Sequence, residues 1–188
     1  MTNQPEANLS ITSISLKTML VHTVTYFAAG LISSTVFDYA ARYADPLLGN
    51  FMRPVSHPMV AAGPMLQVFR GLLFGLVFFL LRDVYFRNKK GWLTAWAVLV
   101  IVGIISPFGP SPSSIEGLIY SNVPWYFHLI GLPEVTIQAL LLVYVTHYWV
   151  THPEKKWLAW VFGVVFALVI LMSTLGILAG LGILQVPA

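Results

Sequence analysis

Residues 60–81 read VAAGPMLQVFRGLLFGLVFFLL, an apolar run that carries one charged side chain, Arg70, near its middle. An α-helix rises about 1.5 Å per residue, so a run of this length crosses a hydrocarbon core of about 30 Å. Such a run is typical of a membrane-spanning helix, in which an ionised side chain is costly and usually functional. The stretch therefore predicts a membrane protein with a polar site inside the bilayer.

The composition of the whole chain agrees with this expectation. Of its 188 residues, 57% are hydrophobic and 9% are charged, and the mean hydropathy is +0.79, whereas an average soluble domain carries about 25% charged residues. The absence of cysteine excludes disulfides, thiolate metal sites and cysteine nucleophiles. The net charge of +3 is modest, and the basic residues lie beside apolar runs instead of along one stripe, which argues against a nucleic-acid partner. We expect the lipid bilayer to be the main partner.

Four other apolar runs extend the pattern to about five transmembrane helices. The apolar sequence that begins at Val123 is interrupted by Gly131-Leu132-Pro133, which predicts a broken or re-entrant segment before the fourth span. The third run is short and ends at the Pro-rich segment 106–110. The predicted fold class is therefore all-α, a polytopic membrane helix bundle. The expected spans are residues 18–37, 60–81, 92–105, 135–150 and 157–184.

Positive charge is divided unevenly between the loops, and this predicts the orientation. Two basic residues, Arg42 and Arg53, lie on one side, and seven lie on the side that holds the N-terminus. The positive-inside rule then places the N-terminus in the cytoplasm and the C-terminus outside. We expect a multi-pass protein of the cell membrane, with a loose cytoplasmic N-terminus over residues 1–17 and a single transmembrane helical domain over residues 18–188. The seven basic residues are Lys17, Arg82, Arg87, Lys89, Lys90, Lys155 and Lys156.

Arg70 needs a partner inside the bundle, and the sequence offers Glu134. Gln67 lies three residues before Arg70 on the same helical face, and Gln138 lies one turn after Glu134 on its face. The helical rise places the two faces at similar depths in the membrane. We therefore predict a buried cluster of Arg70, Glu134, Gln67 and Gln138, reached from outside.

Two interpretations of this cluster stay open. A buried ion pair can fix the register of two helices without any chemistry. Alternatively, an intramembrane charge marks a binding or ion-relay site, and a helix that starts at Pro133 would point free backbone donors toward an outer cavity. Gly71 and Gly75 form a small-xxx-small pair that lets another helix approach this face closely.

The predicted outer loops contain further candidate ligand-binding residues, namely His57, Glu116 and His128. For each of these residues, a purely structural role is the alternative to ligand binding. Ser113-Ser114-Ile115-Glu116 fits a capping box that opens a short helix, and a lone histidine is usually only hydrogen-bonded. No His/Glu pair with i, i+4 spacing occurs on one helix, so we expect no metal site.

His22 and His147 lie at roughly matching depth in the first and fourth spans, which raises the alternative of a haem held by two imidazoles. However, His22 belongs to a stripe of small and polar residues typical of helix packing. We therefore expect no cofactor.

Three functions compete at this point. The favoured one is transport or binding of an ion, small molecule or lipid in an outward-facing cavity centred on the Arg/Glu cluster. The second is a membrane-embedded enzyme that uses His57, His128, Glu116 and Glu134 on a lipid-soluble substrate, although no catalytic motif supports it. The third is a non-catalytic accessory subunit, as a homo-oligomer or beside a partner membrane subunit.

Overall fold

The computed structural model describes residues 9–184, and every regular element in this part of the chain is helical. Four helices are long and apolar enough to span a membrane: α1 (Ile11–Val36), α5 (Gly63–Leu80), α9 (Trp125–Thr151) and α10 (Trp157–Gly180). A shorter apolar helix consists of α7 (Gly91–Val100) and the π-helix η1 (Ile101–Ile105). The remaining helices are α2 (Tyr39–Ala44), α3 (Pro46–Gly49), α4 (Pro58–Ala61), α6 (Arg82–Tyr85) and α8 (Ile115–Tyr120). The all-helical expectation is confirmed, and the number of membrane crossings stays a prediction.

The first helix begins before the predicted span. The Ser10 side chain caps α1 by accepting a hydrogen bond from the Ser13 amide at 3.3 Å. In the second turn of α1, the Lys17 ammonium group donates a hydrogen bond to the Trp149 carbonyl at 3.3 Å. Its long side chain thus places the charge at a polar partner, and the helix continues through this residue. Residues 11–17 are therefore helical, which corrects the expectation of a loose segment there. Residues 1–8 of that segment lie outside the described residues.

Glycines bring α5 into backbone contact with α1. A Cβ atom built on Gly71 would lie 2.7 Å from Met19 Cα, and one built on Gly75 would lie 2.5 Å from Ser15 Cα. Neither position accepts a side chain without moving one of the helices. The small-residue face that the sequence predicted is confirmed, and it fixes which side of α5 meets α1.

The third apolar run ends where the sequence indicates. α7 has 10 residues and η1 has 5, which together rise about 22 Å at the α-helical spacing and fall short of a hydrocarbon core of about 30 Å. The Ser106 amide closes the π-helix on the Ile101 carbonyl at 2.8 Å. Pro107 follows and ends the helical hydrogen bonding.

The break predicted at residues 131–133 is wrong, because α9 runs as one helix through Pro133. Proline removes one backbone donor, but a membrane helix tolerates this when neighbouring groups compensate. The Thr136 hydroxyl donates to the Leu132 carbonyl at 2.5 Å, and the Trp96 indole donates to the Thr136 carbonyl at 3.0 Å. These bonds secure the turn after the proline and tie it to α7.

The last helix packs on α4 through the Gly176-x-x-x-Gly180 pattern. Cβ atoms built on Gly176 and Gly180 would lie 3.0 Å from Ala61 Cβ and 2.9 Å from Pro58 Cγ, respectively. The Ser173 hydroxyl donates to the Ala61 carbonyl at 2.5 Å, which adds a polar contact to the same interface. The glycine pattern thus marks a close contact between α10 and α4.

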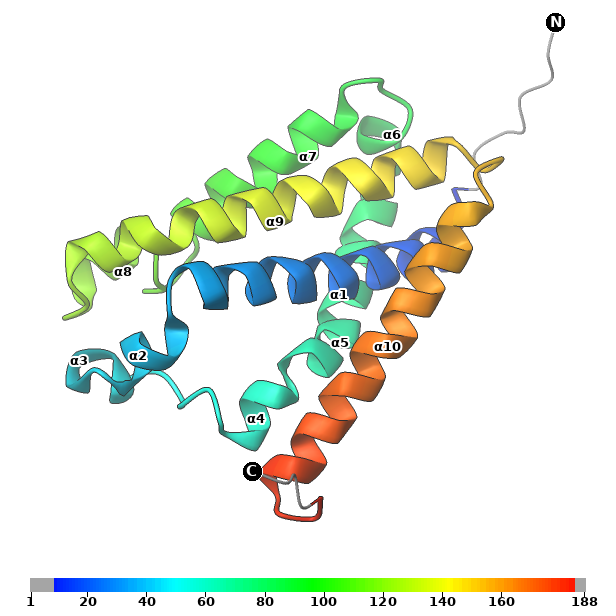
Figure 1. Cartoon of the computed structure of the whole chain (residues 1–188). Coiled ribbons are helices and arrows are strands. Elements are labelled where there is room, and N and C mark those ends of the chain that lie inside the picture. Colours follow the sequence, from blue (N-terminus) through cyan, green and yellow to red (C-terminus); the bar gives the residue numbers. More distant parts are fainter. Residues whose placement is uncertain (1–8, 185–188) are drawn as a thin grey trace, which may run out of the picture.

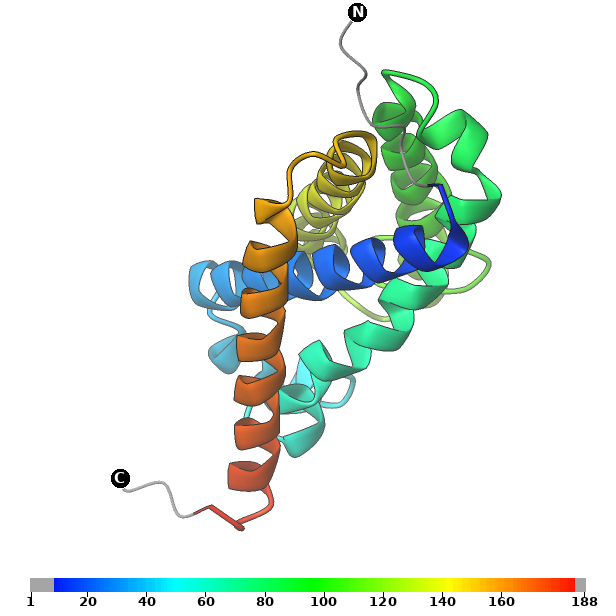
Figure 2. The ribbon, with the colours of Figure 1, turned by 90° about the vertical axis from the view of Figure 1, so that its right-hand side faces the viewer.

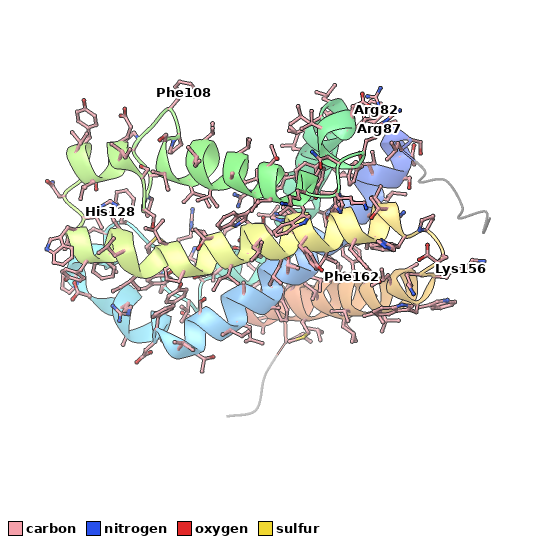
Figure 3. All side chains as sticks on the ribbon, turned by 90° about the horizontal axis from the view of Figure 1, so that it is seen from above. Arg82, Arg87, Phe108, His128, Lys156 and Phe162 are labelled. Atoms are coloured by element: carbon pink, nitrogen blue, oxygen red, sulfur yellow. The ribbon has the colours of Figure 1, made fainter. Side chains whose placement is uncertain are left out.

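Successive loops alternate between two ends of the bundle. The start of α1, the α6–α7 loop and the α9–α10 loop lie at one end, and α2, α3, α4, α8 and the end of α10 lie toward the other (Figure 1). Arg82, Arg87 and Lys156 lie at the first end, and Phe108 and His128 lie at the opposite end (Figure 3). We call these the basic end and the far end. The positive-inside rule predicts that the basic end is cytoplasmic.

The apolar core is gathered at the basic end. Each member of the main buried cluster on α1, α5, α9 and α10 lies in the half of its helix nearer that end. The far half has fewer buried apolar side chains among the described residues, and it contains the polar groups that the sequence singled out. The core residues are Ile14, Val21, Phe78, Tyr85, Phe86, Leu142, Val143, Trp149, Val150 and Leu158.

Candidate ligand-binding site

Two polar residues of α1, His22 and Tyr26, lie one helical turn apart in the part of α1 that packs against α5. His22 is 1% exposed, and its Nε2 atom donates to Gln67 Oε1 across 3.1 Å. The Gln67 amide in turn donates to the Gly63 carbonyl at 3.3 Å, and Phe74 packs edge-on against the imidazole. With Nε2 protonated, Nδ1 of a neutral His22 is an acceptor. It has no hydrogen-bond partner among the described residues.

Arg70 follows on the same α5 face, near the middle of the helix. Its guanidinium carbon lies 5.4 Å from the centroid of the Phe74 ring. The side chain is exposed, and the one ion pair within residues 9–184 joins Arg87 to Asp83. The prediction of a buried Arg70 paired with Glu134 is therefore wrong.

The arrangement of three helices explains the missing ion pair. α1 packs against both α5 and α9, and it crosses between α9 and the lower part of α5 in two perpendicular views (Figure 1, Figure 2). Arg70 on α5 and Glu134 on α9 therefore have α1 beside them both, and each finds a different neighbour. The helical rise predicted that Arg70 and Glu134 lie at the same depth in the membrane. Depth does not show which helix lies between them.

Glu134 binds a phenol instead of the guanidinium. Its carboxylate accepts a short hydrogen bond from the Tyr39 hydroxyl. Asp38 allows this contact because it adopts a left-handed conformation with φ 46° and caps α2, which turns the chain back over α9. Burial, followed by the hydrogen bond to Glu134, raises the pKa of Tyr39. Tyr39 therefore remains a neutral hydrogen-bond donor at neutral pH.

Tyr26 lies near both charged groups, without a hydrogen bond to either within residues 9–184. The charges of Arg70 and Glu134 both act on its hydroxyl, and a Cβ atom built on Gly63 would lie 3.8 Å from that oxygen. Gln138 is half-buried one turn along α9 from Glu134. We call the set that surrounds Tyr26 the polar cluster. It consists of His22, Tyr26, Tyr39, Gln67, Arg70 and Glu134.

The polar cluster combines one cation, one carboxylate, two phenols and an imidazole with a free acceptor nitrogen. These groups can bind an anionic or zwitterionic molecule through charge-assisted hydrogen bonds. Sequence reasoning found Arg70, Glu134 and Gln67 but missed Tyr39. Its only signal was its position just after the first span, and nothing in the sequence shows that α2 folds back.

His57 has a structural role at the far end. Its Nδ1 atom caps α4 by accepting from the Met59 amide at 3.1 Å, and its Nε2 atom lies 3.2 Å from Arg53 Nη1. Both ring nitrogens are thus engaged near the surface. The geometry explains His57 as a helix cap, and whether it also touches a ligand stays a prediction.

His128 and Glu116 lie around α8. His128 is buried, and its Nδ1 atom accepts from the Ser113 amide at 3.1 Å. Ser114 caps α8 by accepting from the Gly117 amide at 2.9 Å. The predicted capping box Ser113-x-x-Glu116 is therefore wrong. Ser113 adopts a left-handed φ of 69° and Ser114 is the cap, so the third helical position is Gly117 and not Glu116. Glu116 lies in the first turn, where its charge complements the helix dipole.

The outer-face residues proposed for an enzyme do not form one constellation. In residues 9–184, no hydrogen bond or ion pair joins any two of His57, Glu116, His128 and Glu134. No group of three or more His, Asp or Glu side chains that could hold a metal ion occurs in this part of the chain.

The two histidines considered for a haem belong to different surroundings. His22 contacts α5, whereas the His147 ring packs on Phe86 and its Nε2 atom donates to the Asn88 carbonyl at 3.1 Å. Each imidazole thus has its own hydrogen-bond partner on a separate segment, and the geometry gives no support for a shared axial pair.

Comparison with known proteins adds no assignment, since no family model, curated protein or solved structure matches this chain. The functional argument depends on the geometry of the polar cluster.

Proposed function

We propose that this chain is a multi-pass protein of the cell membrane that binds a small anionic or zwitterionic molecule at the polar cluster, for transport or ligand recognition. The supporting observation is that Arg70 lies in a long apolar helix without a carboxylate partner in residues 9–184, while the neighbouring Gln67 is bonded to His22 and Glu134 is bonded to Tyr39. The far end is the entrance, and the packed core at the basic end closes the other side.

The energetics of Arg70 favour a ligand. An arginine at the centre of a membrane helix costs about 3 kcal/mol on insertion scales and needs water or an anion near it. Its aromatic neighbour Phe74 offers a cation–π contact, which contributes about 1 kcal/mol and does not replace an anion. A carboxylate or phosphate on a ligand would supply the missing charge.

Cysteine accessibility tests the site directly, because the chain contains no cysteine. Single variants Arg70→Cys and Glu134→Cys are treated in intact cells with a membrane-impermeant methanethiosulfonate that carries a sulfonate. We expect both to be labelled from outside, because the reagent needs water and a thiolate. Phe69→Cys is the matched control: Phe69 directly precedes Arg70, so its side chain points about 100° away around the helix. Phe69 is 68% exposed, and it should face lipid and remain unlabelled.

Two results would overturn the proposal. If Arg70→Cys is no more reactive than Phe69→Cys, the site has no aqueous access. If the variants react only in inverted membranes, the entrance is at the basic end.

The ligand itself is sought by mass spectrometry of small molecules that purify with the protein in mild detergent. A defined anionic or zwitterionic compound should accompany the native protein and be lost from Arg70→Gln. Equal recovery from both proteins would show that Arg70 does not hold it.

The accessory-subunit alternative has one observation in its favour, since an exposed arginine on α5 can also be covered by a carboxylate of a partner subunit. It predicts a stoichiometric partner protein in the same purification, and Arg70→Gln should then lose the partner instead of a small molecule.

A further inference from the structure

A pocket at the far end is separate from the polar cluster except for one shared residue, Tyr39. It has a volume of about 120 Å³ and lies between α2, the segment after α3, the loop before α8 and the start of α9. Its walls are mostly apolar and aromatic, and Arg42 carries its only formal charge. The lining residues are Tyr39, Arg42, Tyr43, Leu48, Phe51, Met52, Pro112, Val123, Phe127, Ile130 and Gly131.

Arg42 is held at the wall with its terminal donors free. Its Nε atom donates to the Phe37 carbonyl at 2.5 Å, and its guanidinium carbon lies 5.9 Å from the centroid of the Phe127 ring. Within residues 9–184, neither Nη atom has a hydrogen-bond partner. The two Nη groups therefore remain available to an external acid.

Tyr43 lines the same pocket one residue after Arg42. It stacks on Tyr39, with ring centroids 5.1 Å apart, and burial raises the pKa of its hydroxyl. Tyr43 is thus a neutral phenol at neutral pH. The Tyr39 hydroxyl is already engaged with Glu134, and the Tyr43 hydroxyl lies near Glu134 and Tyr26, so the Arg42 guanidinium is the polar group left to the pocket.

The size and position of the pocket narrow the class of ligand. Sites for drug-sized metabolites measure about 300 Å³ or more, and this pocket is smaller and almost wholly apolar. It adjoins the first turn of α9, where Trp125 is 65% exposed as expected for an aromatic side chain at the membrane interface. A ligand with most of its length in the bilayer fits these conditions.

We propose that this pocket binds a long-chain fatty acid, with part of its acyl chain between the aromatic walls and its carboxylate on Arg42. The positive charge of Arg42 selects an acid over an uncharged lipid, and the apolar walls stabilise the chain. This inference does not depend on a ligand at the polar cluster.

Photo-crosslinking tests the proposal. Native protein in neutral phospholipid nanodiscs is exposed to palmitic acid that carries a diazirine, and the crosslinked peptides are mapped by mass spectrometry. We expect adducts within residues 39–52 and 123–131. In the native protein, the corresponding diazirine alcohol should give about tenfold less adduct at these positions, because it lacks the charge-assisted contact.

Arg42→Gln should lower the fatty-acid adduct by about tenfold, and Arg42→Lys should restore part of it. Arg53→Gln is the matched control, because it removes the other far-end loop arginine, which lies beside His57 and outside the pocket lining. It should leave the adduct unchanged.

Two results would overturn the proposal: equal adduct from the acid and the alcohol, or adducts spread over the exposed face of α10 as expected for bulk lipid. The alcohol comparison uses the native protein, so it remains decisive if Arg42→Gln fails to fold. Labelling at Arg70→Cys is a separate measurement, so this proposal and the polar-cluster function can fail independently.

Discussion

At the basic end, α1, α5 and α9 bury apolar side chains against one another, whereas the polar cluster extends from the middle of α1, at His22, to α2 and the far halves of α5 and α9. The basic half is held by glycine contacts at Gly75 and by the Tyr85 hydroxyl, which donates to the Val143 carbonyl at 2.5 Å. In the far half, buried positions are often polar, as at Ser33, and Arg70 is exposed. One half therefore stabilises the fold, and the other has polar groups available for a ligand.

Gly75→Ala should be the most destabilising variant, because it disrupts the packing of the basic half. The added methyl group would meet Ser15 Cα at 2.5 Å, so α1 and α5 must separate, at a cost of about 3 kcal/mol. Thermal unfolding in detergent measures the loss. Gly163→Ala is the control, since a Cβ atom there has nothing within 4 Å. Equal stability of the two variants would refute the close approach of α5.

Gln67→Leu tests whether the far half depends on paired polar groups. It leaves both ring nitrogens of His22 without a partner in a buried site, which should destabilise the protein by about 2 kcal/mol. The double variant His22→Leu with Gln67→Leu removes both groups and should recover most of this loss in the same unfolding assay. A double variant that is less stable than Gln67→Leu would mean that the hydrogen bond is not the reason.

Tyr85→Phe measures how much a buried hydrogen bond stabilises the basic half. It removes the buried donor to Val143 and should lower the free energy of unfolding by about 1 kcal/mol. Tyr144→Phe is a suitable comparison, because Tyr144 is 50% exposed and its hydroxyl has no hydrogen-bond partner within residues 9–184. We expect its melting temperature to match that of the native protein, and a larger loss in Tyr144→Phe would contradict this account.

The smallest expected effect is a change in how the stability of the protein depends on alkaline pH when Tyr39 is replaced. Burial, then the hydrogen bond to Glu134, raises the pKa of Tyr39 in the folded state, whereas an unfolded tyrosine ionises near pH 10. The stabilisation by protonated Tyr39 is therefore complete below about pH 10 and is lost as the pH rises further. The melting temperature should fall less steeply above about pH 10 in Tyr39→Phe than in the native protein. Tyr120→Phe, at a residue 71% exposed, should keep the native slope.

Several features of the fold follow from local patterns. The apolar run at 60–81 is sufficient for α5, and Ser106-Pro107 ends the third run because proline cannot continue a helix. Gly71 and Gly75 predict a close helix contact because they lack side chains. The proline signal failed at Pro133, where α9 continues as one helix and bonds from α7 and within α9 hold the following turn.

The candidate site was only half predictable. A charge in an apolar run identifies Arg70 and Glu134 as unusual, since such a residue needs a partner. Its partner depends on which helices are neighbours, and that choice is not encoded in hydropathy. Tyr39 reaches Glu134 because Asp38 reverses the chain into α2.

The sequence by itself determined that this chain forms helices long and apolar enough to span a membrane and that most of its basic residues lie at one end, because both properties depend on composition and order along the chain. Only the tertiary structure decided that α1 packs against both α5 and α9, that Glu134 binds Tyr39, and that Arg70 is left without a carboxylate within residues 9–184. The physical reason is that helix neighbours are selected by side-chain shape across interfaces, and the periodicity of a single helix does not contain that information.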